Sequence, residues 1–245
     1  MRRSERLIRS GAKRPVLSVL LLISAVICTP LAIRALEVDE PNAQDRQIVR
    51  TIAKRMKLFH LSNQDMDDDI SKKGFQLYLK SLDPSKMYFY QSDIDEFGAS
   101  ADELDDLAKS GDLSFAFAVF NRFLKRIEER LVVINQLIES EHDFTLDEVM
   151  MTDSDELEFA KNPAELKDRW RKRIKYSMLV EKSEETANED AKNKLHRRYT
   201  SFAKRMNQFD AEEVTELFLT SLTTAYDPHS TCLLYTSPSP RDSNL

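Results

Sequence analysis

Histidine is the side chain with the most versatile chemistry in this sequence, because imidazole can bind a metal ion or exchange a proton near neutral pH. The four histidines lie in separate segments, and none belongs to an HxxxH, HxxE or CxxC pattern. We therefore expect no metal site and no cofactor, and we interpret these residues as solvent-facing or capping side chains. They are His60, His142, His196 and His229.

Acidic and serine-based chemistry is not supported by the local patterns either. Asp67 to Asp69 resemble half of a calcium-binding loop, but the glycine and the distal glutamate of such a loop are missing. A solvated helix N-terminus explains three consecutive aspartates better, because the helix dipole favours negative charge there. The serines lie on polar helix faces or in connections without a recognisable partner, so we predict no catalytic residue in this chain.

Two basic segments with interleaved aromatic residues, 169–175 and 196–205, have the composition of a phosphate-binding surface. At helical spacing, however, their aromatic side chains would point toward a core and their charges toward solvent. Acidic residues are also plentiful nearby. We interpret both segments as solvated helix faces and expect no nucleic-acid partner.

The elements that position these residues must be helices, because the chain contains few glycines. Average usage of about 7% would give roughly 17 glycines in a chain of this length, whereas the sequence has four. Tight hairpins, phosphate-binding loops and nucleophile elbows need glycine where φ is positive or where backbones approach closely. We therefore predict an all-α fold, a multi-helix domain.

One long helix is expected to form the centre of this domain. In residues 112–139, apolar residues recur every three or four positions, and charged residues lie on the opposite face. Such a stripe must be covered by other helices. Its members are Leu113, Phe117, Phe120, Leu124, Ile127, Leu131, Ile134 and Ile138.

Further helices are predicted from periodicity and from start and stop signals. Ser92 is a candidate N-cap, Gly111 a C-terminal cap, and Pro163 a first-turn residue that follows a long acidic connection. Asp210 and Glu213 form a capping-box pattern. The expected helices span residues 44–60, 66–82, 92–110, 112–139, a segment that begins at 163, 183–208 and 211–225.

Residues 1–35 differ in composition from the rest of the chain. A basic stretch precedes an uncharged run from Val16 to Ile33, and the small residues Ala32 and Ala35 lie at the end of this run, where a peptidase could cut. This order is typical of a secretory signal peptide, although 18 uncharged residues also just reach the length of a membrane anchor. We predict a signal peptide over residues 1–35, with an uncleaved anchor as the alternative, and membrane contact only through this leader.

The body behind this leader is strongly acidic. Residues 1–35 hold seven Lys or Arg and one Glu, so the remainder carries 29 basic and 41 acidic residues, a net charge of −12. Such a body has no bias toward nucleic acid or an anionic bilayer surface. Cys28 lies in the leader and Cys232 close to the C-terminus, so the exported body has no disulfide option.

Three segments taken together resemble a known family. Residues 77–97 (LYLKSLDPSKMYFYQSDIDEF), 162–176 (NPAELKDRWRKRIKY) and 222–231 (LTTAYDPHST) are similar, in this order, to the N-terminal helical region of large periplasmic tail-specific proteases, also called C-terminal processing peptidases. The resemblance implies a helical N-terminal domain over residues 40–231. It also implies a periplasmic location, with an inner-membrane anchor if the leader is retained.

Proteins of this family resemble serine proteases with a Ser-Lys dyad, and they carry a PDZ domain that binds the free C-terminus of a substrate. The resemblance implies that this chain is a fragment that precedes both parts. Such a fragment would contribute scaffold and substrate enclosure rather than catalysis. Protein substrates would bind through the PDZ domain, and a periplasmic adaptor protein is a further expected partner.

Asp227, Pro228, His229 and Ser230 match the family's motif at the exit of its helical region, just before the PDZ domain. We interpret these four residues as a structural joint and not as catalytic groups. The alternative for the whole chain is a stand-alone exported helical module that binds a partner protein through its acidic surface.

The last residues depart from the family pattern. Where the family usually has an aromatic residue and a short Ser-Pro turn, this chain has CLLYTSPSPRD at positions 232–242. One permitted reverse translation of this stretch resembles a transposon end and the adjoining adapter used to prepare sequencing libraries. We interpret residues 232–245 as a non-native, disordered tail, with a natural proline- and serine-rich loop as the alternative.

Deletion of residues 232–245 should leave the stability of the helical body nearly unchanged. A foreign tail has not been selected to pack against the helices, and Pro238 and Pro240 prevent it from extending the last one. The free energy of unfolding should change by no more than about 0.5 kcal/mol. Thermal denaturation of both chains measures this change, and a loss several times larger would show that the tail is part of the fold.

Overall fold

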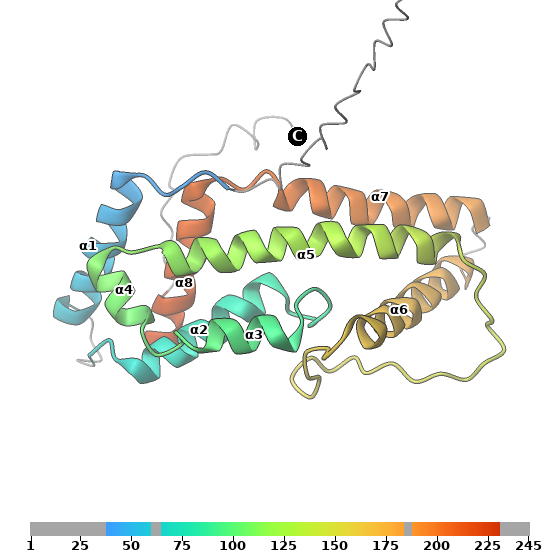
Figure 1. Ribbon diagram of the computed structural model, residues 1–245, viewed down its shortest axis with the longest axis horizontal. Coiled ribbons are helices and arrows are strands. Elements are labelled where there is room, and N and C mark those ends of the chain that lie inside the picture. Colours follow the sequence, from blue (N-terminus) through green and yellow to red (C-terminus); the bar gives the residue numbers. More distant parts are fainter. Residues whose placement is uncertain (1–37, 60–64, 184–187, 231–245) are drawn as a thin grey trace, which may run out of the picture. The chain divides into compact units, whose positions relative to one another are not determined.

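A computed structural model describes residues 38–59, 65–183 and 188–230, which all belong to one folded unit. The predicted leader, residues 1–35, and the predicted foreign tail, residues 232–245, lie outside the described residues. Within the described part the fold is all-α, as predicted, with an isolated bridge between Tyr90 and Ala160 in place of any strand. The helices, shown in Figure 1, are α1 (Ala43–Phe59), α2 (Asp68–Leu82), α3 (Gln91–Gly98), α4 (Leu104–Ser110), α5 (Ser114–Glu139), α6 (Pro163–Ser183), α7 (Asn188–Met206) and α8 (Ala211–Tyr226).

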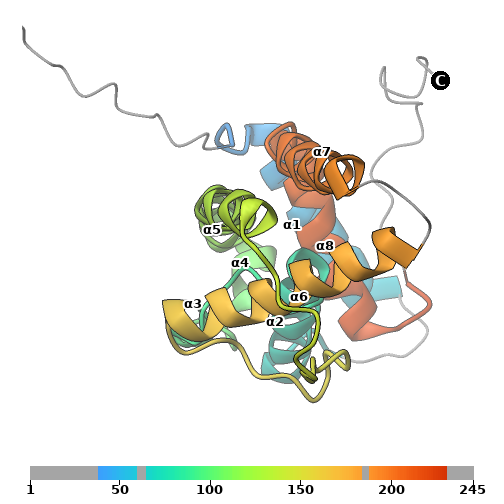
Figure 2. The same ribbon diagram turned by 90° about the vertical axis from the view of Figure 1, so that its right-hand side faces the viewer.

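Helix α5 is the longest element and carries the predicted apolar stripe. Seven of the eight stripe residues are buried and Leu131 is half-buried. Helix α7 lies along α5 in both views, and α6 contacts both of them (Figures 1 and 2). The stripe is therefore covered by other helices, as expected for an apolar surface of this length.

Helices α2 and α8 pack against each other as an antiparallel pair. The Tyr78 and Phe218 rings meet edge to face with their centroids 5.6 Å apart, and Gly74 lies against Leu222. A Cβ atom on Gly74 would come within 2.6 Å of the Leu222 side chain, so this close approach requires glycine. The Tyr78 hydroxyl also donates to the carbonyl of Ala116 at 2.9 Å, which links the pair to α5.

The prediction of one helix over residues 92–110 was wrong, because the chain there forms two helices, α3 and α4. After Phe97 the backbone bonds run between residues three apart, from Ser100 to Phe97 and from Ala101 to Gly98, which is the pattern of a tight turn. Gly98 weakens the helix at this point. The predicted N-cap Ser92 was also wrong: the N-cap of α3 is Tyr90, two residues earlier, and the helix begins at Gln91.

The core consists of two clusters of buried side chains. The larger cluster joins α1, α2, α4, α5 and α8, and the smaller one joins the C-terminal half of α5 to α6 and α7. Tyr88 packs against both clusters, with ring centroids 5.5 Å from each of Phe123, Trp170 and Phe202. The short segment between α2 and α3 therefore joins the two halves of the core.

None of the helices in the described residues is long and apolar enough to cross a membrane. The predicted connection between residues 141 and 163 is confirmed, since the chain from Ser140 to Asn162 forms no helix. Gly111 ends α4 with φ at +73°, a left-handed conformation that glycine adopts without strain.

The substitution Phe120→Asp is expected to unfold the domain. Phe120 is fully buried and stacks on Phe209 with ring centroids 5.4 Å apart, so aspartate would place an unpaired charge in the core. Val132→Asp is the matched control, because Val132 lies on the same helix and is 60% exposed. Circular dichroism at rising temperature should show no cooperative transition for Phe120→Asp and a nearly unchanged one for Val132→Asp. Equal effects of the two changes would contradict the assignment of the core face.

Candidate functional site

The residues that match the family motif form the turn in which α8 ends. The backbone N–H of Asp227 donates to the carbonyl of Thr223 at 2.9 Å. The Asp227 carboxylate then accepts hydrogen bonds from the His229 N–H and the Ser230 hydroxyl, both at 3.1 Å. Pro228 favours an end to the helix here, because the residue before proline is pushed into an extended conformation. The four predicted residues are thus neighbours in one turn, in which Pro228 and His229 are exposed.

A second Asp-Pro dipeptide ends α2, and its carboxylate is buried. Asp83 is 1% exposed and accepts the backbone N–H groups of Met87 at 2.9 Å, Tyr88 at 2.8 Å and Phe89 at 3.0 Å. Burial raises the pKa of the Asp83 carboxyl, while the three N–H donors and the positive charge of Arg130 oppose that shift. Asp83 therefore fixes the backbone of the segment that joins the two core clusters.

Both Asp-Pro turns line one groove beside α2. The groove has a volume of about 940 Å³ and reaches from Pro228, after α8, to Pro84, after α2. Because α2 and α8 are antiparallel, these two turns lie at opposite ends of the helix pair. The connection before α6 closes one side of the groove through Asp155 and Phe159.

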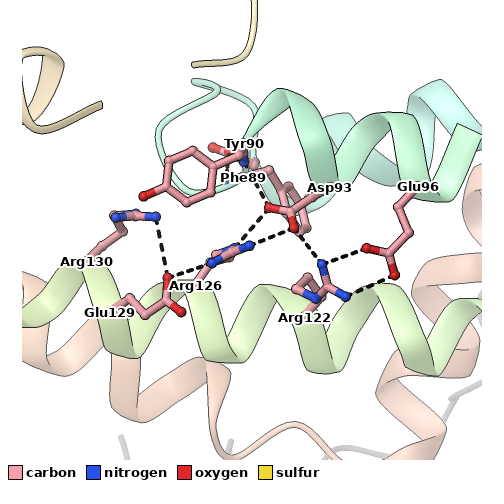
Figure 3. Close-up of polar contacts among 9 residues, drawn as sticks. Phe89, Tyr90, Asp93, Glu96, Arg122, Arg126, Glu129 and Arg130 are labelled. Carbon is pink, nitrogen blue, oxygen red and sulfur yellow. Dashed lines mark hydrogen bonds and ion pairs between the residues drawn. The ribbon is translucent and has the colours of Figure 1, made fainter. Parts of the chain in front are cut away.

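A polar network fastens α3 to α5 (Figure 3). The buried Asp93 carboxylate accepts two hydrogen bonds from Arg126, at 2.8 and 2.9 Å, and one from Arg122 at 2.6 Å. It also accepts the backbone N–H of Tyr90 at 2.9 Å, which caps the start of α3. Arg122 in turn holds Glu96 through two hydrogen bonds of 3.0 Å. Four side chains and one backbone group thus fix the orientation of a helix of only two turns.

Burial and the neighbouring hydrogen-bond donors shift the pKa of the Asp93 carboxyl in opposite directions. Burial by itself raises the pKa of the Asp93 carboxyl, but the hydrogen bonds from Arg126, the Tyr90 N–H and Arg122 outweigh burial and hold the pKa below its usual value. Arg130 extends the row of arginines and stacks on the Tyr90 ring, 4.5 Å from its centroid. Its buried Nε and Nη2 atoms make no hydrogen bond within the described part of the chain.

Two of the described histidines, His142 and His196, make hydrogen bonds through their rings, whereas His229 is exposed. The His142 ring bonds to the carbonyl of Leu137 at 2.9 Å, and His196 lies between Asn135 at 2.9 Å and Glu139 at 2.7 Å. His60 lies outside the described residues. Across the described ranges, no group of three or more His, Cys, Asp or Glu side chains converges as metal ligands would.

The segments that resembled binding motifs belong to helix faces and caps. Asp67 caps α2 by accepting the N–H of Ile70 at 3.1 Å, which confirms the interpretation of the three aspartates as a helix N-terminus. On α6, Trp170 is buried, whereas Arg171 and Lys175 contact the half-buried Glu148 and lower the pKa of its carboxyl to about 2. The inward position of Trp170 confirms the predicted apolar face. The charges of Arg171 and Lys175 are ion-paired rather than merely solvated, which was not predicted.

Sequence reasoning missed the contacts of Asp83 and the network around Asp93. The signal for the network was present, because Arg122, Arg126 and Arg130 recur at four-residue intervals and so share one face of α5. Their partner could not be identified, since Asp93 lies 29 and 33 residues away along the chain from Arg122 and Arg126.

The network makes stability depend on pH in a defined direction. An aspartate with a lowered pKa in the folded state adds stability above the unfolded pKa of about 3.9, and this stability is lost as pH falls through the folded pKa. Asp93→Asn should cost about 2–3 kcal/mol at neutral pH, and the deficit should shrink below about pH 4. Denaturant unfolding at a series of pH values measures the difference between the two chains.

Asp147→Asn provides the matched control for this series, because Asp147 is an exposed residue of the connection before α6. It should change the free energy of unfolding little at any pH. A constant deficit of Asp93→Asn from pH 7 to pH 2 would contradict the role assigned to the ionised carboxylate.

Comparison with known proteins places this fold in a family. Residues 52–239 match the family described as "Tail specific protease N-terminal domain". The match extends past residue 231 into the segment interpreted as foreign, and that interpretation stays a prediction. A "Tail-specific protease" of Haemophilus influenzae is 30% identical over 180 residues, which cover 73% of this chain and 26% of the relative. The chain thus corresponds to about a quarter of its relative's length, and it belongs to the tail-specific protease family as an N-terminal region.

Proposed function

We propose that this chain is the helical scaffold of an exported tail-specific protease, and that it encloses the polypeptide substrate without cleaving it. The observation that carries the proposal is the match of residues 52–239 to the N-terminal domain of this family. The basic leader and the relative's family support export to the periplasm.

The contacts of the described polar residues support a structural role. Asp83, Asp93, Arg122 and Arg126 use their charged groups to fix the backbone or to join helices. Residues that hold the fold in this way are poorly suited to exchange protons with a substrate. In this proposal proteolysis belongs to other parts of the complete enzyme, which would also bind the substrate's tail, and a periplasmic adaptor protein would deliver substrates.

A chimaeric enzyme tests the scaffold proposal. In the Haemophilus influenzae relative, the region that matches this chain is replaced by residues 40–231, and cleavage of a reporter protein with an apolar free C-terminus is measured. We expect the chimaera to cleave the reporter and the purified 245-residue chain not to cleave it. The relative with its matching region deleted should be inactive, because the catalytic part would lack its scaffold.

Three outcomes would contradict the proposal. Cleavage by the 245-residue chain alone would show that the chain is itself a peptidase. An active deletion mutant would show that the helical region is dispensable. A chimaera that folds, as judged by cooperative thermal unfolding, but does not cleave would show that this helical region does not serve as the scaffold.

A further inference from the structure

The groove beside α2 has the length and shape of a binding site for an extended chain. A helix of 15 residues spans about 22 Å, and the groove extends from Ile70, in the first turn of α2, to Lys86, beyond its last turn. An extended polypeptide advances about 3.3 Å per residue, so a segment of about six or seven residues would fill this length.

Lysines dominate the charge of the groove. Lys73, Lys80 and Lys86 line it, whereas its acidic members are Asp83 and Asp155. The Asp83 carboxylate is buried and bonded to three backbone N–H groups, so it adds little negative charge to the groove surface. The groove is thus a basic strip on a body whose net charge is strongly negative.

The three lysines differ in how strongly they are already bound to other groups of the protein. Lys73 is exposed and has no hydrogen-bond or ion-pair partner within the described ranges. Lys80 pairs with Asp155 at 2.9 Å, but both side chains are more than half exposed, and such pairs contribute little stability. Lys86 bonds to the carbonyl of Leu157 at 2.5 Å, so it helps to build the wall. Lys73 and Lys80 are therefore available to an incoming anion.

The rest of the lining is largely apolar. Ile70 and Tyr226 are buried and form part of the floor, while Leu77 and Phe159 are half-buried in the wall. An occupant must therefore offer apolar side chains as well as negative charge.

We propose that this groove binds an extended internal segment of a partner protein that carries both apolar and acidic side chains. Lys73 and Lys80 are two helical turns apart on one face, which separates their charges along the groove by about 10 Å. A polypeptide can place carboxylates over that distance with apolar side chains between them, whereas a single lipid concentrates its negative charge in one head group. The spacing of the lysines along an apolar groove thus favours a peptide over a single bound lipid.

This inference is independent of the proposed function. It requires neither protease activity nor a free C-terminus on the partner, and it assigns recognition to the helical region itself.

The experiment uses the 245-residue chain and a fluorescein-labelled peptide in which leucine and glutamate alternate over seven residues. The peptide is acetylated and amidated, so that it has no free terminus. Fluorescence anisotropy should show saturable binding that weakens with added salt. Lys73→Glu should weaken binding by about threefold to tenfold.

Asp155→Asn should act in the opposite direction. It removes the carboxylate that competes for Lys80, so we expect binding about twofold to threefold tighter. Lys125→Glu is the matched control, because Lys125 is an exposed lysine on α5 that does not line the groove. A peptide with lysine in place of glutamate should not bind.

Several outcomes would overturn the proposal. Absence of saturable binding would do so directly. Equal losses with Lys73→Glu and Lys125→Glu would show a non-specific charge effect, and binding unchanged by Lys73→Glu would show that the peptide binds outside the groove. Groove-dependent binding of phosphatidylglycerol vesicles without binding of the peptide would identify a lipid site. Circular dichroism of every variant confirms that the folded state is retained.

Discussion

A single buried carboxylate, that of Asp83, determines how the two halves of this fold are joined. Three consecutive N–H groups, of Met87, Tyr88 and Phe89, point at its oxygens and so form a tight loop directly after α2. Without this acceptor the three donors would be left in or near the core without partners, at a cost of about 1–3 kcal/mol each. The loop directs the Tyr88 ring into the space between the two clusters, where it meets Trp170 of α6. The packing of the second cluster thus depends on a polar interaction in the first.

The groups around Asp83 compensate for the burial of its carboxylate. An isolated carboxylate in an apolar core would be neutralised by protonation. Here backbone dipoles supply hydrogen bonds, and Arg130 supplies positive charge although two of its buried nitrogens have no hydrogen bond among the described residues. Arg130 is held by the face of the Tyr90 ring, 4.5 Å away. An aromatic face accommodates a guanidinium without accepting hydrogen bonds from it. Arg130 also forms an ion pair with Glu129 at 3.5 Å (Figure 3), so its positive charge acts on both this carboxylate and that of Asp83.

Sequence reasoning succeeded where a feature depends on neighbours within one helix. The α5 stripe, the Asp210 and Glu213 capping box and the start of α6 at Pro163 all follow from spacings of three or four residues. It failed where a distant partner decides the outcome. Gly98 is a local signal for the break between α3 and α4. The position of α4 also depends on hydrogen bonds between Asp105 and Ser71 of α2, which are 34 residues apart in the sequence. Periodicity carries no information about such pairs. The motif at residues 227–230 was therefore recognised from the sequence, whereas the contacts of Asp83 and Asp93 were not.

A comparison of the two Asp-Pro dipeptides shows which structural features depend on the dipeptide and which depend on the residues that follow it. Asp83 and Asp227 both precede proline, both have extended φ values, and each donates its N–H to the carbonyl four residues earlier as its helix ends. After Asp83 the chain continues with aromatic residues that return to the core, and the carboxylate is buried beneath them. After Asp227 it continues with Pro228 and His229, which are exposed, and the carboxylate accepts hydrogen bonds from the His229 N–H and the Ser230 hydroxyl in the same turn. The dipeptide therefore sets where each helix ends, and the residues that follow it decide whether its carboxylate is buried or lies at the surface. This difference explains why the same Asp-Pro dipeptide supports the core at the end of α2 and forms a surface turn at the end of α8.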